Sequence, residues 1–305
     1  MRIAIVGTGG LGGYFGGRLA AAGVDVRFLA RGAHLAALQA TGLRIQSPKG
    51  DVHLPKIFAT DDPAAIGPVD VVFFTVKLYD VEAALALLPP LLGPGTVVVP
   101  FQNGVDAVGL LERAVGREHT AGGTAYVAAV VAEPGLIRHT AMDQIIFGEL
   151  DRKTSPRLEA LRDACKPAGF QATLSDDIQA AIWTKFVRLT VFSGMTSVTR
   201  RPIGAVVADP ELLAIALEAI YEGAAVARAK GVAIPAEIAA TAGAALAALP
   251  PHAKSSMLED LERGRRLELP WLSGALVRIG REVGVPTPIH RFIAAVLAPY
   301  VAGGG

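Results

Sequence analysis

Residues 2–12 read RIAIVGTGGLG, a short apolar run that passes directly into a cluster of glycines. The run is rich in β-branched side chains and predicts a buried strand. The glycines fit the pattern G-x-G-x-x-G at Gly7, Gly9 and Gly12, and residues 11–22 then read as a helix. A strand, this turn and a helix in succession predict a turn that binds the pyrophosphate of a dinucleotide.

Each glycine of this turn has its own physical reason. Gly7 permits the tight turn, Gly9 lets the main chain approach a phosphate, and Gly12 allows the helix to pack closely on the strand. Free amides at the start of the helix and the positive end of its dipole then attract the anion. The alternative is a glycine-rich turn without a ligand. The expected cofactor-binding residues of the turn are Gly7, Thr8, Gly9, Gly10, Leu11 and Gly12.

The first half of the chain alternates strand-like and helical segments. Residues 26–29, 69–75 and 96–101 are apolar runs typical of strands buried on both faces, and residues 81–88 read as a helix. This alternation predicts an α/β fold, a Rossmann-type doubly wound parallel sheet. The other segments expected here are a hairpin at 42–54, antiparallel strands at the sheet edge within 121–148, a helix at 157–168 and a strand at 171–174.

After about residue 177 the strand signals stop, and long alanine-rich segments follow. We therefore predict a Rossmann-type domain at residues 1–176 and an all-helical domain at residues 177–305. The helices expected in the second domain are 178–192, 210–230, 235–249, 271–283 and 288–301.

The composition excludes several classes of protein. Hydrophobic residues make up 51% and charged residues 19%, which excludes a disordered chain. The net charge of +1 gives no basic field for nucleic acid or anionic lipid. Prolines and glycines interrupt the longest apolar run, at 83–105, so we expect no membrane span. The single cysteine, Cys165, and six histidines without ligand spacing predict no metal site and a cytoplasmic protein.

The end of the second strand predicts which cofactor binds. Proteins that bind NAD usually carry Asp or Glu there, which bonds the ribose 2′-hydroxyl. Here the strand ends in FLAR at residues 28–31, and Asp25 precedes the strand. The guanidinium of Arg31 can form paired hydrogen bonds with a 2′-phosphate. We therefore predict NADP(H); the alternative is a solvated surface arginine.

Polar side chains follow two of the buried strands. Lys77 comes just after the strand at 69–75, and Asn103 after the strand at 96–101. Ligands in open α/β sheets bind beyond the carboxyl ends of the strands. We therefore expect Lys77 to contact the ribose or adenine side of the cofactor. Asn103 is expected at the nicotinamide ribose or a substrate oxygen, and the alternative for both is ordinary loop polarity.

Lys185 lies in the apolar sequence Trp183-Thr184-Lys185-Phe186. A lysine held in an apolar cleft is suited to donate a proton to a developing alkoxide. Periodicity alone favours the alternative, a surface lysine whose aliphatic stem covers apolar residues.

Taken together, the motifs resemble those of the ketopantoate reductases (2-dehydropantoate 2-reductases) over essentially the full chain. The resemblance implies NADPH-dependent reduction of 2-dehydropantoate to pantoate, on the route to pantothenate and coenzyme A. The motifs that carry it are Gly7-x-Gly9-x-x-Gly12, Arg31-Gly32, Thr75-Val76-Lys77, Gln102-Asn103-Gly104, Trp183-x-Lys185-Phe186, and Ser255-Ser256-Met257-x-x-Asp260 with Gly264-Arg265 and Glu268 beyond it.

The resemblance also implies roles for individual residues. Lys185 is similar to the general acid that protonates the C2 oxygen, and Glu268 to the acidic partner near that lysine and the nicotinamide ribose. Ser256 resembles the residue that binds the substrate carboxylate. The nucleotide contacts implied are Arg31, Lys77, Asn103 and Glu268.

The sequence departs from the family on the substrate side. The family helix usually carries asparagines four and eight residues after the lysine, where this chain has Leu189 and Ser193, and Ile203 replaces a further asparagine. Ser193 can keep one hydrogen bond to a substrate, whereas Leu189 and Ile203 cannot, and each lost bond costs ~0.5–1.5 kcal/mol. A less hydroxylated or more apolar 2-oxo acid or ketone is therefore an alternative substrate.

A third hypothesis is a redox sensor that binds NADP without turnover. Lys185 and Glu268 speak against it, because sensing needs no proton donor. The partner expected is a small-molecule 2-oxo acid. The alanine- and glycine-rich helices can pack internally or against a second copy, which leaves a homodimer open.

Overall fold

The computed structural model describes residues 1–304, and the chain divides into two compact units. The first unit contains residues 1–102 and 106–178, and the second contains residues 103–105 and those from 179 onward. Asn103 therefore shares its unit with Lys185 and Glu268, although it lies between two segments of the first unit in the sequence.

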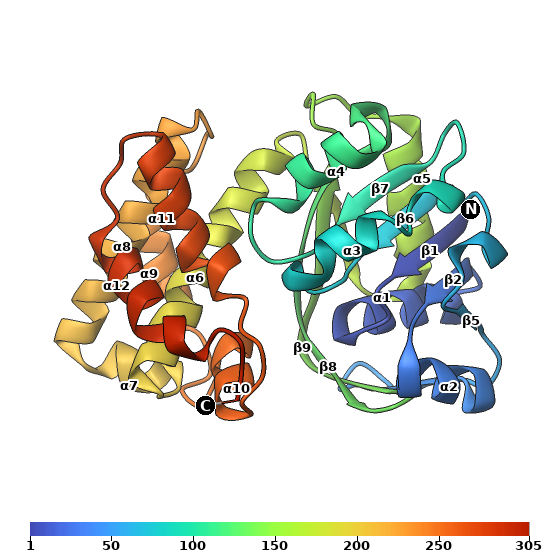
Figure 1. Cartoon of the computed structure of the whole chain (residues 1–305), viewed down its shortest axis with the longest axis horizontal. Coiled ribbons are helices and arrows are strands. Elements are labelled where there is room, and N and C mark those ends of the chain that lie inside the picture. Colours follow the sequence, from blue (N-terminus) through green and yellow to red (C-terminus); the bar gives the residue numbers. More distant parts are fainter. Residues whose placement is uncertain (305) are drawn as a thin grey trace. The chain divides into compact units, whose positions relative to one another are not determined.

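The first unit is built on a parallel sheet of five strands in the order β5-β2-β1-β6-β7 (Figure 1). The predicted apolar runs form β1, β2, β6 and β7, and Ile3, Ile5, Val72 and Phe73 are wholly buried. The predicted doubly wound parallel sheet is confirmed. Its strands are β1 (Arg2–Val6), β2 (Asp25–Leu29), β5 (Phe58–Thr60), β6 (Val71–Phe74) and β7 (Val97–Pro100).

Asp25 is the first residue of β2, whereas the sequence placed it before the strand. Its carboxylate accepts from Arg2 at 2.9 Å and pairs with Arg27 at 2.7 Å, because both guanidiniums reach the amino end of the sheet. The acid therefore lies at the opposite end of β2 from Arg31, as the prediction of NADP(H) requires.

The helices of the first unit connect these strands. The sequence did not predict α2, α4 or β5, since in α2 only Leu35 and Leu38 are buried and the apolar stripe is too narrow to stand out. The helix expected at 81–88 ends early, before Pro89. The α-helices are α1 (Gly10–Ala21), α2 (Gly32–Thr41), α3 (Val81–Leu85), α4 (Ala107–Val115) and α5 (Pro156–Cys165), and the 3-10 turns are Pro63–Ala65, Leu78–Asp80, Pro89–Leu91, Arg117–His119 and Lys166–Ala168.

A second sheet completes the first unit and corrects one expectation. The antiparallel strands expected at the edge of the parallel sheet form a sheet of their own, in the order β10-β9-β3-β4, with β8 paired to β9. The reason is length, since β8 and β9 have 12 and 13 residues and extend past the parallel strands, which have three to five residues (Figure 1). The strands are β3 (Leu43–Gln46), β4 (Val52–Leu54), β8 (Gly122–Glu133), β9 (Leu136–Gly148) and β10 (Gln171–Leu174).

The glycine-rich helix α1 lies between the two sheets. A Cβ at Gly16 would come within 2.7 Å of Ile5 in the parallel sheet. On the other side, a Cβ at Gly13 would come within 2.7 Å of Ile137 and one at Gly17 within 2.6 Å of Ile45. The glycines of α1 therefore let one helix pack closely against both sheets, and this fixes the turn at its start.

The second unit is built of helices in the residues that the structure describes. The helix α6 runs to Thr199, seven residues further than expected, and the short helix α7 was not predicted. The helices are α6 (Ile178–Thr199), α7 (Ile203–Ala208), α8 (Pro210–Ala229), α9 (Ile238–Ala247), α10 (Ser256–Glu262), α11 (Ser273–Glu282) and α12 (Pro288–Leu297), with 3-10 turns at Leu269–Trp271 and Ala298–Tyr300.

Small residues bring α6 close to its neighbours in this unit. A Cβ at Gly223 of α8 would lie 3.2 Å from Val187, and one at Gly194 would lie 2.8 Å from Ile293 of α12. Lys185 therefore sits on a helix that is held on two sides. None of the helices described is both long enough and apolar enough to cross a membrane.

Candidate active site

The glycine turn after β1 has the geometry that its sequence predicts. Gly7 has φ +99°, and a Cβ there would lie 2.8 Å from the amide nitrogen of Val76. A Cβ at Gly12 would collide with the carbonyl of Gly7 and lie 2.5 Å from Oγ1 of Thr75. The Thr75 hydroxyl donates to the Gly7 carbonyl at 2.7 Å. The glycine turn and the two residues after β6, Thr75 and Val76, are thus packed too closely for side chains at Gly7 and Gly12.

Gly9 differs from the other two glycines of the motif. Within residues 1–304, no atom lies within 4 Å of the position that a Cβ would take at Gly9. Its backbone is extended, with φ −84°, so another residue could adopt the same conformation. The packing of the protein does not require glycine here. A glycine that leaves open space beside the start of a helix fits the approach of a dinucleotide phosphate.

The remaining residues of the turn are placed by the fold. Thr8 donates from both its amide, at 3.2 Å, and its hydroxyl, at 3.0 Å, to the carbonyl of Leu29 in β2. Both donors of Thr8 therefore anchor the turn, and its contact with the cofactor stays a prediction. A Cβ at Gly10 would collide with the carbonyl of Ala129 in β8, and Leu11 is half-buried against the core.

The polar residues expected at the nucleotide end follow neighbouring strands. Arg31 follows β2 and caps α2 with an extended backbone, and Lys77 is an exposed residue that follows β6. Nη2 of Arg31 pairs with Oδ2 of Asp80 at 2.8 Å. The sequence reasoning missed Asp80, whose signal is an acidic residue three positions after Lys77 in the loop that follows β6.

The structure brings three predicted residues together in the second unit. Nζ of Lys185 donates to Oδ1 of Asn103 at 3.1 Å, and Nδ2 of Asn103 donates to Oε2 of Glu268 at 3.4 Å. Lys185 is only 9% exposed and Glu268 6% exposed. Lys185 is therefore a buried lysine in a polar cluster, and the alternative of a surface lysine is wrong.

Burial changes the acidity of this lysine. Loss of hydration lowers the pKa of Lys185 to about 8, and the negative charge of Glu268 opposes part of that shift. An ammonium with this pKa is still largely protonated at neutral pH, and it gives up its proton far more readily than an ordinary lysine. The cluster can therefore act as a general acid toward a carbonyl oxygen.

The residues of α6 and α7 discussed for the substrate side differ in burial and in hydrogen bonding. Leu189, one turn after Lys185 on α6, is half-buried against the helical core. Ser193, a further turn along, is 1% exposed, and its hydroxyl has no partner among the described residues. Ile203 is fully buried in the core, and its amide donates to the carbonyl of Ala253 at 2.9 Å.

The serine pair at the start of α10 has divided roles. Ser256 is the exposed first residue of the helix, while its neighbour Ser255 is buried. The Ser255 hydroxyl accepts from the amide of Leu258 at 3.1 Å and bonds the hydroxyl of Thr196 at 2.8 Å. Ser255 thus fixes α10 on α6, and Ser256 lies outside the hydrogen bonds that join Lys185, Asn103 and Glu268.

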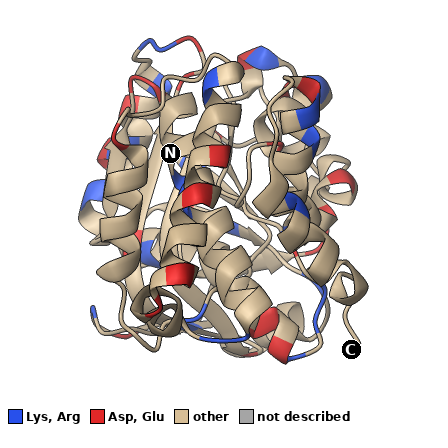
Figure 2. Ribbon diagram, turned by 90° about the vertical axis from the view of Figure 1, so that its left-hand side faces the viewer, with Lys and Arg blue, Asp and Glu red and all other residues tan. Residues whose placement is uncertain are grey.

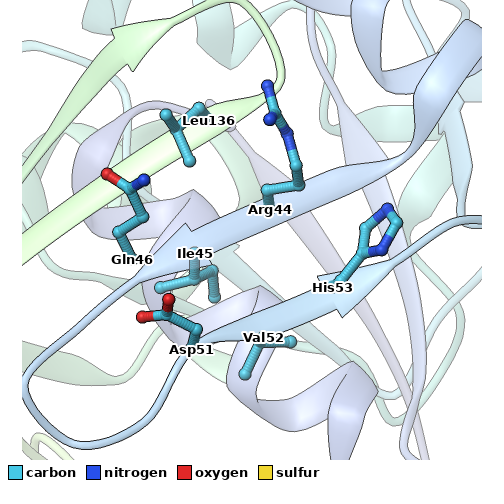
Figure 3. A pocket seen from close by; sticks show the side chains of 7 residues that line it. All are labelled: Arg44, Ile45, Gln46, Asp51, Val52, His53 and Leu136. Carbon is cyan, nitrogen blue, oxygen red and sulfur yellow. The ribbon is translucent and has the colours of Figure 1, made fainter.

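A hollow on the second sheet does not contribute to this site. Figure 3 shows it between side chains of β3, β4 and the start of β9. Its Arg44 pairs with Glu133 at 2.7 Å. The lining residues are Arg44, Ile45, Gln46, Asp51, Val52, His53 and Leu136, and none of them is a predicted site residue.

In the described part of the chain we find neither a group of metal ligands nor a reactive thiol. Residues 1–304 contain no group of three His, Cys, Asp or Glu side chains placed to hold a metal ion. Burial raises the pKa of Cys165 to about 12, so its thiol is unreactive.

On the face shown in Figure 2, basic and acidic segments are interspersed along the helices and loops.

Comparison with known proteins agrees with the geometry. Residues 3–152 match the family model described as ketopantoate reductase PanE/ApbA, and residues 177–301 match the C-terminal model of that family. A 2-dehydropantoate 2-reductase of Mesorhizobium japonicum is 35% identical, covering 98% of this chain and 96% of that protein. One of Archaeoglobus fulgidus is 32% identical, covering 95% and 94%.

Solved structures extend this likeness to three dimensions. The crystal structure of 2-dehydropantoate 2-reductase from Geobacter metallireducens matches with a TM-score of 0.92 at 30% identity, covering 98% of this chain and 99% of that one. A PanE/ApbA family ketopantoate reductase from Ralstonia eutropha matches with a TM-score of 0.90 at 33% identity and covers 98% of both chains. The chain belongs to the ketopantoate reductase family.

Proposed function

We propose that this protein reduces 2-dehydropantoate to pantoate with NADPH. The observation that carries the proposal is the buried Lys185, which bonds Asn103 at 3.1 Å and whose pKa is lowered to about 8. This is the proton donor that reduction of a carbonyl to an alcohol requires. Membership of the ketopantoate reductase family supplies the substrate.

The cofactor follows from the first unit and from the family. Ketopantoate reductases use NADPH, which supplies the hydride when bound. The open space at Gly9 and the start of α1 fit the pyrophosphate. Arg31 and Lys77 would hold the nucleotide end, because they follow the strands on either side of β1.

Lys185, Asn103 and Glu268 have different roles in the proposed proton transfer. Lys185 donates a proton to the C2 oxygen as negative charge develops there. Asn103 holds Nζ in place, and Glu268 keeps the buried ammonium charged by its own opposite charge. A positioned general acid of this kind contributes about 10²–10⁴-fold to the rate.

A second candidate substrate is favoured by Leu189. This side chain replaces a family asparagine one turn from Lys185 and is half-buried against apolar neighbours. The buried Ile203 offers no polar group to compensate. We therefore keep a less hydroxylated 2-oxo acid or ketone as the alternative, with the same cofactor and the same proton donor.

We also propose the assembly and location that the sequence suggests. The two functional domains would be residues 1–176 and 177–305, in a cytoplasmic protein with one unreactive thiol. A homodimer is proposed because Tyr221 of α8 and Phe292 of α12 are 59% and 60% exposed. Light scattering at several concentrations tests the dimer directly.

A steady-state assay separates these functions. NADPH oxidation is followed with 2-dehydropantoate and with a panel of 2-oxo acids, and NADPH binding is measured by fluorescence titration. The highest kcat/KM with 2-dehydropantoate supports the first proposal, and a higher value with another acid supports the second. Tight NADPH binding without oxidation in the presence of any of them would favour the redox sensor and overturn both.

A further inference from the structure

Arg31 and Asp80 are joined although they lie 49 positions apart. Arg31 follows the carboxyl end of β2, and Asp80 ends the 3-10 turn that follows β6. In the sheet, β2 and β6 are the two neighbours of β1. The ion pair of 2.8 Å therefore connects the loops on both sides of the strand that leads into the glycine turn.

The two partners differ in how far they are exposed. The Arg31 side chain is 82% exposed, while that of Asp80 is 32% exposed. A guanidinium has five N–H donors, and a bond from Nη2 to one carboxylate oxygen leaves most of them available. Arg31 can therefore meet a second anion, but it would do so with the Asp80 carboxylate beside it.

We propose that Asp80 is a specificity-determining residue that weakens the preference for NADPH over NADH. The inference rests on the proposed function, in which Arg31 receives the 2′-phosphate. That phosphate and the Asp80 carboxylate then share one guanidinium, so two like charges lie within a few ångströms of each other. The ribose 2′-hydroxyl of NADH carries no charge, and it can donate to a carboxylate.

Asp80 has two opposing effects on binding of the 2′-phosphate, and the larger one decides whether its removal strengthens binding. Asp80 also orients Arg31, which favours phosphate binding, but an exposed ion pair orients a side chain only weakly. Solvent screens both effects, but repulsion between a carboxylate and a phosphate needs no fixed geometry, so at close range it outweighs that orientation. Removal of the Asp80 charge should therefore strengthen binding of a 2′-phosphate by about three- to tenfold.

The test compares two nucleotide fragments that differ by the 2′-phosphate. Binding of adenosine 2′,5′-bisphosphate and of 5′-AMP is measured by isothermal titration for the wild type and for Asp80→Asn. The variant should bind the bisphosphate about three- to tenfold more tightly and 5′-AMP within about twofold of the wild type. The gain should shrink as salt is raised, since exposed charges are screened.

The matched control is Glu82→Gln, which removes an exposed carboxylate two residues away on α3. It should change both affinities by less than about twofold, since Asp80, the carboxylate that pairs with the Arg31 guanidinium, is still in place. Unchanged or weaker binding of the bisphosphate by Asp80→Asn would overturn the inference, as would an equal gain in Glu82→Gln.

The same experiment keeps this inference apart from the proposed function. A wild type that oxidises NADPH with 2-dehydropantoate, paired with an Asp80→Asn variant without the gain, refutes the role of Asp80 alone. A wild type that binds neither NADPH nor the bisphosphate refutes the proposed function and the inference together. The ratio of KM values for NADPH and NADH gives a second readout, which should fall in Asp80→Asn.

Discussion

Lys185 donates a hydrogen bond to Asn103 across 3.1 Å, which joins residues 82 positions apart. Asn103 in turn donates to Glu268 at 3.4 Å. An amide that accepts from an ammonium and donates to a carboxylate has a defined orientation, with its oxygen toward the lysine and its nitrogen toward the glutamate. Asn103 therefore holds the ammonium of Lys185, the proposed proton donor, in place from a loop outside α6.

The first prediction concerns the proton donor. Lys185→Met keeps the length of the side chain but removes the ammonium, so kcat with 2-dehydropantoate should fall about 10²–10⁴-fold. NADPH binding should stay within about threefold of the wild type, because no positive charge of the nucleotide end is removed. Stopped-flow turnover and fluorescence titration measure the two quantities.

Lys230→Met is the matched control, since Lys230 is an exposed residue at the end of α8. It should leave kcat unchanged. If Lys185→Met kept turnover near that of the control, Lys185 would not be the general acid.

The second prediction is the pH dependence of the rate. In the proposed reaction Lys185 acts in its protonated form, and its pKa is lowered to about 8 by burial. The rate should therefore be level at neutral pH and fall as pH rises through about 8. Glu268→Gln removes the charge that raises this pKa, so the falling limb should move to lower pH. If the rate of Glu268→Gln fell over the same pH range as that of the wild type, Glu268 would not be the group that raises the pKa of Lys185.

The same pKa predicts how stability changes with pH. The folded pKa of about 8 lies below the ordinary lysine value of 10.5, so the unfolded chain binds more protons between these two values. The free energy of unfolding should therefore increase as pH rises through that window. Urea unfolding at pH 8 and pH 10 should show this gain in the wild type and a smaller one in Lys185→Met.

The fourth prediction uses the two kinds of glycine in the turn. Gly9→Ala adds a methyl group where no described atom lies within 4 Å, so thermal stability should change little. The methyl would occupy the space expected for the pyrophosphate, and NADPH affinity should fall at least about tenfold, because close approach of the main chain is lost. Calorimetry and titration on one preparation measure both.

Gly12→Ala and Gly95→Ala complete this comparison. The Gly12 methyl would collide with the carbonyl of Gly7, so unfolding should become easier by about 1–3 kcal/mol. Gly95 has open space around its Cβ position and lies outside the turn, so both stability and affinity should stay unchanged. Equal NADPH affinity in Gly9→Ala and Gly95→Ala would exclude the turn as the pyrophosphate site.

Local sequence patterns predicted the helices and strands that depend on residues close together in the chain. The strand, turn and helix at residues 2–21 follow from β-branched residues and glycines that are neighbours in the chain. The second sheet could not be predicted in this way. Its strand β9 pairs with β3, which lies about ninety residues earlier, and that pairing sets the close packing on α1.

The candidate site shows the same limit. The residue types Lys185, Asn103 and Glu268 were predicted from their motifs, but their hydrogen bonds depend on a loop that leaves the first unit and joins the second. Asp80 was not predicted because its effect depends on Arg31, which follows a different strand. Long-range pairing of charges leaves no periodic signal in a sequence.

The last prediction addresses the substrate. Leu189 lies one turn after Lys185 on α6, and Leu189→Asn would supply an amide where the family usually has one. One added hydrogen bond is worth ~0.5–1.5 kcal/mol, so KM for 2-dehydropantoate should fall about 2- to 12-fold. KM for 2-oxo-3-methylbutanoate, which lacks the hydroxyl group, should not fall, since it offers no group for the amide to bond. Steady-state kinetics with each acid gives the ratio of the two KM values.

Leu189→Met serves as the control, because it keeps an apolar side chain of similar volume against the helical core. Loss of apolar contacts in Leu189→Asn should also lower the free energy of unfolding by about 1–2 kcal/mol, so KM is compared at a temperature where both variants are folded. If Leu189→Asn lowered KM for both acids equally, or for neither, the side chain at 189 would not face the substrate. The preference for a hydroxylated acid would then have to come from Ser193 or Ser256, the other two residues expected at the substrate.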